Sequence, residues 1–221
     1  MLARLHDPLL AVLSVGLVAL LLILVRAIQR ERRLSAPALR KLLHALIGLG
    51  TLALTPLFHS RGWAIVPPAL FTAVNASPRL RAFLPGIATD PKKVRGLWMF
   101  PLGVCLTYLF FWSFDHRGAV LAGIAALAFA DPAAALVGTK LGQRRFERWA
   151  HGRTLEGSLA FLAIAGAASA CVAAAIPGGQ SPIRVGVGCG LVGAAAEALS
   201  PAGYDNVTVP LLVAAAYRLL A

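Results

Sequence analysis

The sequence is poor in charged residues, and acidic residues are especially scarce. Only 14% of its 221 residues are charged, and there are 9 Asp and Glu against 21 Lys and Arg. A soluble domain carries about a quarter charged residues, whereas this chain is 58% hydrophobic with a mean hydropathy of +0.75. This composition excludes a disordered chain and an ordinary soluble enzyme, and it is typical of a polytopic membrane protein.

Several familiar motifs are also missing. The three cysteines, Cys105, Cys171 and Cys189, form no CxxC pair, which excludes a disulfide-rich module and a zinc ribbon. The chain has no GxxxxGK[ST], HExxH or GxSxG, so P-loop kinases and the common hydrolases are excluded. A GxGxxG match at 188–193 lies inside an apolar stretch without a strand–turn–helix context, and we do not interpret it as a dinucleotide site.

Long stretches without charge dominate the rest of the sequence. Five of them run for 17 to 27 residues, at 8–25, 42–60, 62–78, 96–114 and 157–183. Three more apolar stretches contain or follow an acid, at 118–139, 185–198 and 206–221. Because about 20 apolar residues span a bilayer as a helix, we expect an all-α, polytopic integral membrane helix bundle. It would have about eight transmembrane helices in a single domain over residues 1–221.

The basic residues are distributed unevenly between the loops. Sixteen of the 21 Lys and Arg fall in three alternate loops, 26–41, 79–95 and 140–153. Cytoplasmic loops carry such an excess, so we expect a multi-pass protein with these loops in the cytoplasm and both termini outside. Topology therefore explains the net charge of +12, and no nucleic-acid partner is expected.

Four of the nine acids lie at or inside the ends of the expected helices: Asp131, Glu156, Glu197 and Asp205. In the eight-helix arrangement all four lie on the cytoplasmic side. Intramembrane carboxylates are costly and usually functional. The alternatives are a structural Asp–Arg pair or a solvated helix end, but four acids converging on one face favour a site.

Glycines recur at helical spacing beside these acids. Gly138 and Gly142 share a face with Asp131, and Gly186, Gly190 and Gly193 share one with Glu197. Small residues let helices approach closely. We therefore expect the glycines to pack helices together and to position the acids, without themselves taking part in chemistry.

Two segments look like helix starts. Thr154 is a plausible N-cap with Glu156 in the first turn, and residues 205–210 form a second start with Pro210 expected in the first turn. The nearby cations Lys140, Arg144, Arg145 and Arg153 could neutralise phosphate, although the positive-inside bias accounts for them equally well. Carboxylates, cations and helix starts on one face suit a magnesium–nucleotide complex.

At these residues the chain resembles the CTP-dependent lipid-alcohol kinases, the family of phytol kinase, dolichol kinase and the yeast-type diacylglycerol kinase. The segment RKLLHALIG at 40–48 resembles the family's RKxxHxxxG block, and DPAAALVGTKLG at 131–142 resembles DxxAxxxGxxxG. RTLEGS at 153–158 resembles [KR]TxEGS, and Glu197 followed by DNVTVP at 205–210 resembles E…DNxxxP. Segment 72–75 departs from many members, because it lacks the acidic and basic pair expected there.

The resemblance implies a membrane kinase that transfers the γ-phosphate of CTP to the hydroxyl of phytol, geranylgeraniol or another polyprenol, with Mg²⁺. Its length suggests a compact member in the inner membrane of a bacterium, with the active site on the cytoplasmic face. The implied roles are then as follows: catalytic Asp131, Glu156, Glu197 and Asp205; metal-binding Asp131, Glu156 and Asp205; phosphate-binding Lys140, Arg144, Arg153, Thr154 and Asn206; substrate-orienting Lys41 and His44. For His44, a core histidine with a backbone partner is an equally good interpretation.

Three alternatives remain open from the sequence. A diacylglycerol kinase would use a different lipid, and a cytidylyltransferase would release pyrophosphate instead of CDP. A small transporter would gather polar residues at the membrane midplane and often show an internal repeat, and no repeat is evident.

Overall fold

The computed structural model is all-helical over the residues that it describes, which are 2–30, 36–81, 91–112, 117–146, 153–176, 181–201 and 203–221. In this part of the chain the only β-type pairing is an isolated bridge between Arg145 and Thr154. The helices in chain order are α1 (Leu2–Arg30), α2 (Ala36–Leu54), η1 (Thr55–Leu57), α3 (Arg61–Ala76), α4 (Pro78–Arg81), α5 (Pro91–Phe111), α6 (Arg117–Ala125), η2 (Ala126–Ala130), α7 (Asp131–Lys140), α8 (Leu155–Ala175), α9 (Pro182–Leu199) and α10 (Asp205–Leu220).

Each of the eight stretches expected from the sequence corresponds to a helix. The stretch at 118–139 is one continuous helical run, α6–η2–α7, whose middle part η2 is π-helical. Among the described residues, four helical runs are long and apolar enough to cross a membrane: Leu5–Ile28, Arg117–Lys140, Leu155–Ala175 and Pro182–Leu199. Two apolar helical stretches, Lys41–Leu57 and Arg95–Phe111, are shorter. The chain is therefore an all-helical protein with several apolar helices compatible with a membrane.

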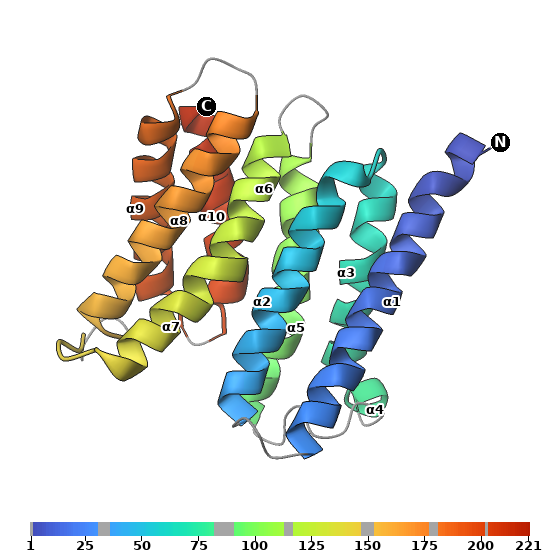
Figure 1. The fold of residues 1–221 in the computed structure, drawn as a ribbon, viewed down its shortest axis with the longest axis horizontal. Coiled ribbons are helices and arrows are strands. Elements are labelled where there is room, and N and C mark those ends of the chain that lie inside the picture. Colours follow the sequence, from blue (N-terminus) through green and yellow to red (C-terminus); the bar gives the residue numbers. More distant parts are fainter. Residues whose placement is uncertain are drawn as a thin grey trace.

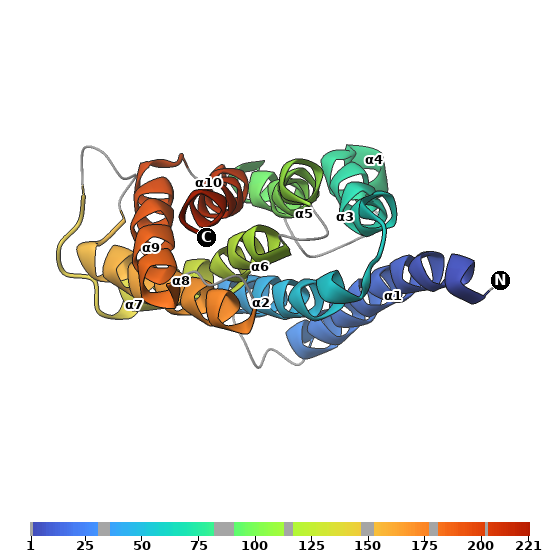
Figure 2. The same ribbon diagram turned by 90° about the horizontal axis from the view of Figure 1, so that it is seen from above.

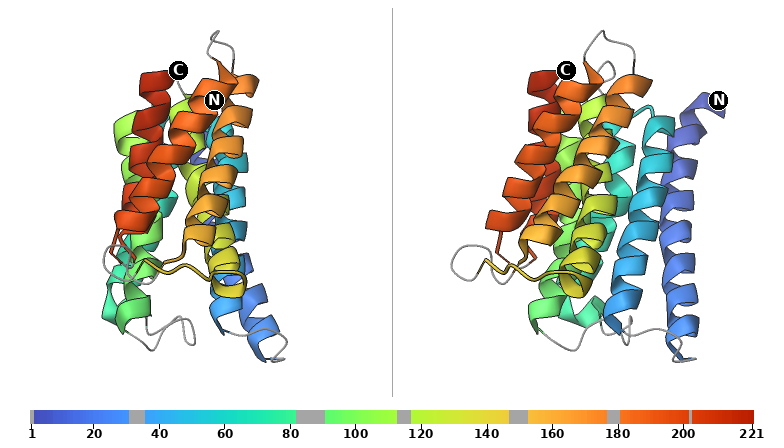
Figure 3. Two further views of the ribbon diagram at one scale, coloured as in Figure 1. Left: turned by 90° about the vertical axis from the view of Figure 1, so that its left-hand side faces the viewer. Right: turned by 60° about the vertical axis from the view of Figure 1, so that its left-hand side comes forward.

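The helices run roughly side by side along one common direction (Figures 1 and 3). Helices α8, α9 and α10 lie toward one end of the long axis of the molecule, and α1 and α3 lie toward the other (Figures 1 and 2). Seen from above, α6 lies between a row that contains α10 and α5 and a row that contains α8 and α2 (Figure 2). Both chain termini lie at the same end of the bundle (Figure 1). The last residues of α1, α3, α7 and α9 and the first of α2, α5, α8 and α10 lie at the opposite end. We call this opposite end the acid end, because three of the four candidate acids belong to helix termini there.

Close approaches between helices occur at glycines. A Cβ atom built on Gly190 of α9 would lie 2.7 Å from the Leu162 carbonyl oxygen of α8, and one on Gly186 would lie 2.8 Å from the Gly166 carbonyl oxygen. A Cβ on Gly138 of α7 would lie 2.8 Å from Thr154 Oγ1. The expectation that these glycines let helices pack closely is confirmed.

Helix α1 lies at the edge of the bundle, against α2 and α3 (Figure 3). Large apolar side chains are exposed along it, at Leu5, Leu9, Val12, Leu13, Leu17, Leu20, Ile23 and Leu24. A continuous apolar surface of this kind is unfavourable in water. A lipid environment would cover it at no such cost.

Candidate active site

Arg153 joins three helix ends at the acid end. Its Nε lies 2.7 Å from Glu197 Oε1, and its Nη2 donates to Asp205 Oδ2 at 2.6 Å. Its Nη1 donates to the Ser200 carbonyl oxygen at 3.1 Å. All three charged side chains are largely buried, with 17%, 9% and 15% exposed for Arg153, Glu197 and Asp205. One guanidinium therefore holds the start of α8, the end of α9 and the start of α10 together.

Asp131, the first residue of α7, is in a different situation. It lines the same cavity as Asn206, the residue that directly follows Asp205. Within the described part of the chain, no hydrogen bond or ion pair reaches its carboxylate. Glu197 Oε2 and Ser158 Oγ are also buried there without a hydrogen-bond partner. Arg153 thus pairs with two of these three carboxylates and leaves Asp131 without a counter-charge, an arrangement that favours a further cation.

The π-helical segment η2 directly precedes Asp131, and Pro132 explains one feature of it. In the π register the Leu127 carbonyl would accept a hydrogen bond from residue 132, but proline has no N–H. His44 of α2 takes this position, with its Nε2 2.9 Å from the Leu127 carbonyl oxygen. The His44 ring also packs against Phe100, with 4.2 Å between ring centroids. His44 therefore has the backbone partner expected of a core histidine.

A cavity of about 270 Å³ opens beside these groups. Apolar side chains of α1, α2, α3 and α5 form most of its wall, while Lys41, His44, Asp131 and Asn206 contribute polar groups. On α5 the lining runs from Gly96 to Tyr108, about 18 Å at 1.5 Å per residue.

The two ends of the cavity differ in character. Lys41, Asn75 and Asn206 lie near helix termini at the acid end. At the other end, the hydroxyl of Tyr108 hydrogen-bonds to Thr55 Oγ1 at 2.6 Å. The cavity is thus a long apolar space with its charged groups toward the acid end, a shape that suits a lipid with one polar end.

Glu156 contacts the segment after α7 instead of the other acids. Its Oε1 and Oε2 accept from the Arg144 backbone N–H at 3.3 and 3.4 Å. In the described part of the chain, no hydrogen bond or ion pair connects it to Asp131, Glu197 or Asp205. The structure therefore brings three of the four candidate acids together and gives Glu156 a separate set of contacts.

The remaining candidates divide between buried and exposed positions. Thr154 is buried and caps α8, because its Oγ1 accepts from the Gly157 backbone N–H at 3.1 Å, as expected. Lys140 and Arg144 are exposed at the acid end. Lys41 is half-buried on the cavity wall.

Asn206 follows Asp205 and is held by local hydrogen bonds. Its backbone N–H donates to Asp205 Oδ1 at 3.0 Å, and its Nδ2 donates to the Gly203 carbonyl oxygen at 3.2 Å. The expectation for Pro210 was wrong: α10 begins at Asp205, so Pro210 lies in its second turn. Without an N–H at Pro210, the Asn206 carbonyl has no partner four residues on, and Gly103 of α5 packs directly against it.

Sequence reasoning missed two features. The pairing of Arg153 with two acids at once was not expected, although a basic residue directly before a helix start was visible in the sequence. The group of His6, Asp7 and His59 was also missed. An adjacent His–Asp pair near one helix start and a histidine before another could have suggested it.

No family model, no curated protein and no solved structure matches this chain.

Proposed function

We propose that the protein is a membrane-embedded kinase that transfers the γ-phosphate of CTP to the hydroxyl of a lipid alcohol, in a Mg²⁺-dependent reaction. The observation that carries the proposal is the position of Asp131. This carboxylate has no hydrogen-bond or ion-pair partner among the described residues and lines a long apolar cavity. A polyprenol is apolar over its length and carries one hydroxyl at its end. This matches a cavity with an apolar wall and polar groups toward one end.

In this proposal the lipid tail lies between α1, α2, α3 and α5, with its hydroxyl at Asp131. Asp131 would orient the hydroxyl and accept its proton as the oxygen attacks the γ-phosphate. His44 is fixed by the Leu127 carbonyl and would form one wall beside the hydroxyl. Lys41 would add a positive charge there, since it lines the same cavity.

The nucleotide would bind at the acid end. Lys140 and Arg144 are exposed there and suit contacts with phosphate oxygens. Arg153 is already paired with Glu197 and Asp205, so in this conformation its first role is to hold the site together. The carboxylates fit a magnesium ion, because Asp131 has no partner among the described residues and one Glu197 oxygen is buried without one. Mg²⁺ would neutralise phosphate charge when bound near Asp131 and Asp205.

The proposed topology has eight spans, with both termini outside the inner membrane of a bacterium. In support, the helix ends that flank the three basic loops all lie at the acid end, opposite both termini (Figure 1). Such loops face the cytoplasm in most membrane proteins. The site would then open toward the compartment that contains CTP.

A phosphate-transfer assay tests the proposal directly. Purified protein would be supplied with labelled CTP or ATP and a panel of lipid alcohols: phytol, geranylgeraniol, a longer polyprenol and diacylglycerol. We expect CDP and a phosphorylated polyprenol, with turnover lost in chelator and restored by Mg²⁺. Phosphorylated diacylglycerol would redirect the proposal to another lipid, and pyrophosphate would indicate a cytidylyltransferase. The absence of any nucleotide-dependent product would overturn it.

A further inference from the structure

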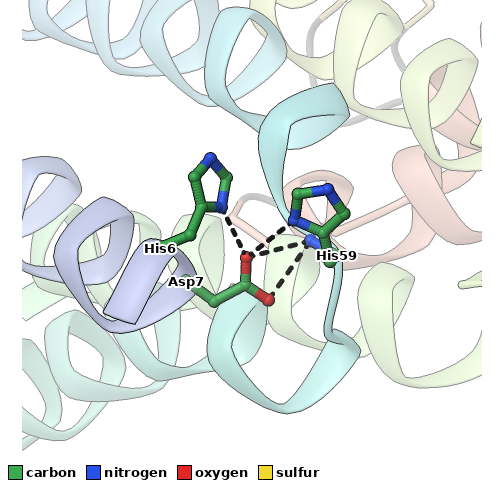
Figure 4. Close-up of side chains that lie close together, drawn as sticks. All are labelled: His6, Asp7 and His59. Carbon is green, nitrogen blue, oxygen red and sulfur yellow. Dashed lines mark hydrogen bonds and ion pairs between the residues drawn. The ribbon is translucent and has the colours of Figure 1, made fainter. Parts of the chain in front are cut away.

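Three side chains with metal-ligand atoms meet at the end of the bundle opposite the acid end (Figure 4). His6 and Asp7 lie near the start of α1, and His59 lies between η1 and α3. Their ligand atoms all lie within 4.8 Å of one another. The group brings the start of α1 against the corner between α2 and α3.

Asp7 is buried and held in place by the backbone. Its Oδ2 accepts from the Ser60 backbone N–H at 2.6 Å, and its Oδ1 accepts from the His59 backbone N–H at 3.1 Å. Ser60 directly precedes α3, so the carboxylate satisfies N–H groups at the start of that helix. These contacts alone explain why an acid is retained at this position.

The two histidines are not needed for that role. Their side chains are 44% and 74% exposed for His6 and His59, and their rings meet edge to face with 4.8 Å between centroids. Nevertheless both direct Nδ1 at the same oxygen, Asp7 Oδ1, at 3.1 Å for His6 and 3.3 Å for His59. Two solvent-accessible imidazoles thus converge on one fixed carboxylate oxygen.

These distances match the edges of a tetrahedral metal site. With metal–ligand bonds of about 2.0–2.1 Å, neighbouring ligand atoms lie about 3.3–3.4 Å apart. One ligand atom from each of the three side chains lies within 4.8 Å of the other two, and the exposed His59 ring can rotate to bring its nitrogen closer. The backbone N–H bonds to Asp7 supply the outer contacts that orient a ligand in known metal sites.

We propose that His6 Nδ1, His59 Nδ1 and Asp7 Oδ1 bind a Zn²⁺-class divalent ion, with a fourth position open to water. Two imidazoles and a carboxylate suit zinc and its late first-row neighbours, whereas magnesium takes oxygen ligands. Each neutral imidazole would carry its proton on Nε2, which leaves the Nδ1 lone pair for the ion, and the ion would link α1 to the α2–α3 corner. This site is separate from the proposed kinase site and does not depend on it.

Zinc binding by untagged protein tests the proposal. Zn²⁺ would be titrated into protein in detergent in competition with a colorimetric chelator. The variants are His6→Asn and His59→Asn, because the asparagine amide nitrogen can replace Nδ1 as a donor to Asp7 but is a poor zinc ligand. We expect one Zn²⁺ per wild-type chain. In each variant we expect an affinity for Zn²⁺ at least about 10-fold lower, because the loss of an outer-shell partner alone already lowers metal affinity by about that factor.

A matched control and a second readout separate metal binding from structural damage. His151→Asn removes a histidine elsewhere in the sequence and is expected to bind zinc as the wild type does. Zinc should raise the Tm of the wild type but not of the double variant, while both have the same Tm without zinc. A double variant that binds zinc as tightly as the wild type would overturn the proposal, as would a wild type that binds none.

Discussion

Asp131 and Arg153 contact the same group of acids in opposite ways. The three guanidinium nitrogens of Arg153 contact Glu197, Asp205 and the Ser200 carbonyl. Asp131, in contrast, adds a negative charge close to Glu197 and Asp205 and has no ion pair within the described residues. Individual residues at this site therefore separate into one that stabilises the fold and one that is retained at a cost in stability.

Asp131→Asn tests whether Asp131 serves catalysis at a cost in stability. The amide keeps the shape of the side chain and removes its charge, so we expect kinase turnover to fall by at least about 100-fold, the scale of one lost preorganised electrostatic contact. The Tm should stay constant or rise slightly, because a partly buried negative charge beside two others is removed. Turnover is measured with labelled CTP, and Glu31→Gln serves as a charge-matched control. Near-full activity or an unfolded protein would show that Asp131 is structural.

Arg153→Gln tests whether Arg153 stabilises the fold. Without the guanidinium, Glu197 and Asp205 lose their shared counter-charge while buried, and breaking a buried pair in this way costs about 3–5 kcal/mol. Arg153→Lys keeps the charge but cannot make three separate nitrogen contacts, so it should cost less. Thermal denaturation in detergent compares the two variants. Equal Tm values for Arg153→Gln and the wild type would contradict the assignment.

At the scale of whole elements, glycine and proline residues set how closely α5 and α6 pack against α10. Pro210 leaves the Asn206 carbonyl without an intrahelical partner, and Gly103 of α5 packs onto that carbonyl. Gly123 of α6 packs onto the Pro210 carbonyl itself. Two neighbouring helices thus approach the backbone of α10 just after Asp205 and Asn206. The site residues of α10 are held by backbone packing as well as by Arg153.

Gly123→Ala tests this packing. A Cβ at Gly123 would overlap the Pro210 carbonyl and press on Ala214, so α10 has to move, at a cost of about 1–3 kcal/mol for overpacking. Gly16→Ala is the matched control, since a Cβ there has nothing within 4 Å and alanine is the better helix former by up to about 1 kcal/mol. We expect a lower Tm for the first variant and an unchanged or higher Tm for the second. The same Tm change in both would show that α6 and α10 do not pack as described.

The sequence predicted the elements better than it predicted their interactions. Five charge-free stretches and three further apolar stretches correctly predicted eight helical segments, and Thr154 and the glycines behave as their residue types suggest. Spacing and capping are local properties, which the sequence shows directly. The partners of Arg153 are 44 and 52 residues away in the sequence, and nothing local selects them. Likewise, the contact between His44 and the Leu127 carbonyl joins residues 83 apart in the sequence, so nothing local predicts it. The role of Glu156 as a contact of the Arg144 backbone also depends on how the chain turns after α7.

At the scale of the whole molecule, the Lys- and Arg-rich loops all belong to one end of the bundle. The helix ends beside the three basic loops lie at the acid end, and both termini lie at the other (Figure 1). The candidate kinase groups and the His6–Asp7–His59 group are therefore at opposite ends. If the bundle spans a membrane, the two sites face different compartments.

Cysteine labelling in intact cells tests that orientation. In a chain whose three cysteines are replaced by alanine, Gln143→Cys would lie at the acid end and Gly62→Cys near the start of α3, both at exposed positions. We expect an impermeant maleimide to label Gly62→Cys in intact cells but Gln143→Cys only after lysis, because loops rich in Lys and Arg remain in the cytoplasm. The reverse pattern would place the proposed kinase site on the wrong side for CTP.

The contacts of Arg153 also bear on how the protein is made. Arg153 is synthesised before Glu197 and Asp205, so its two counter-charges follow it by 44 and 52 residues. The three charges can leave water together only once α9 and α10 have been synthesised. A chain that ends before α10 has Glu197 of α9 as a partner for Arg153 but lacks Asp205, so the guanidinium has only one of its two counter-charges. The last helix to be made, α10, thus supplies the second counter-charge and completes the contacts of Arg153.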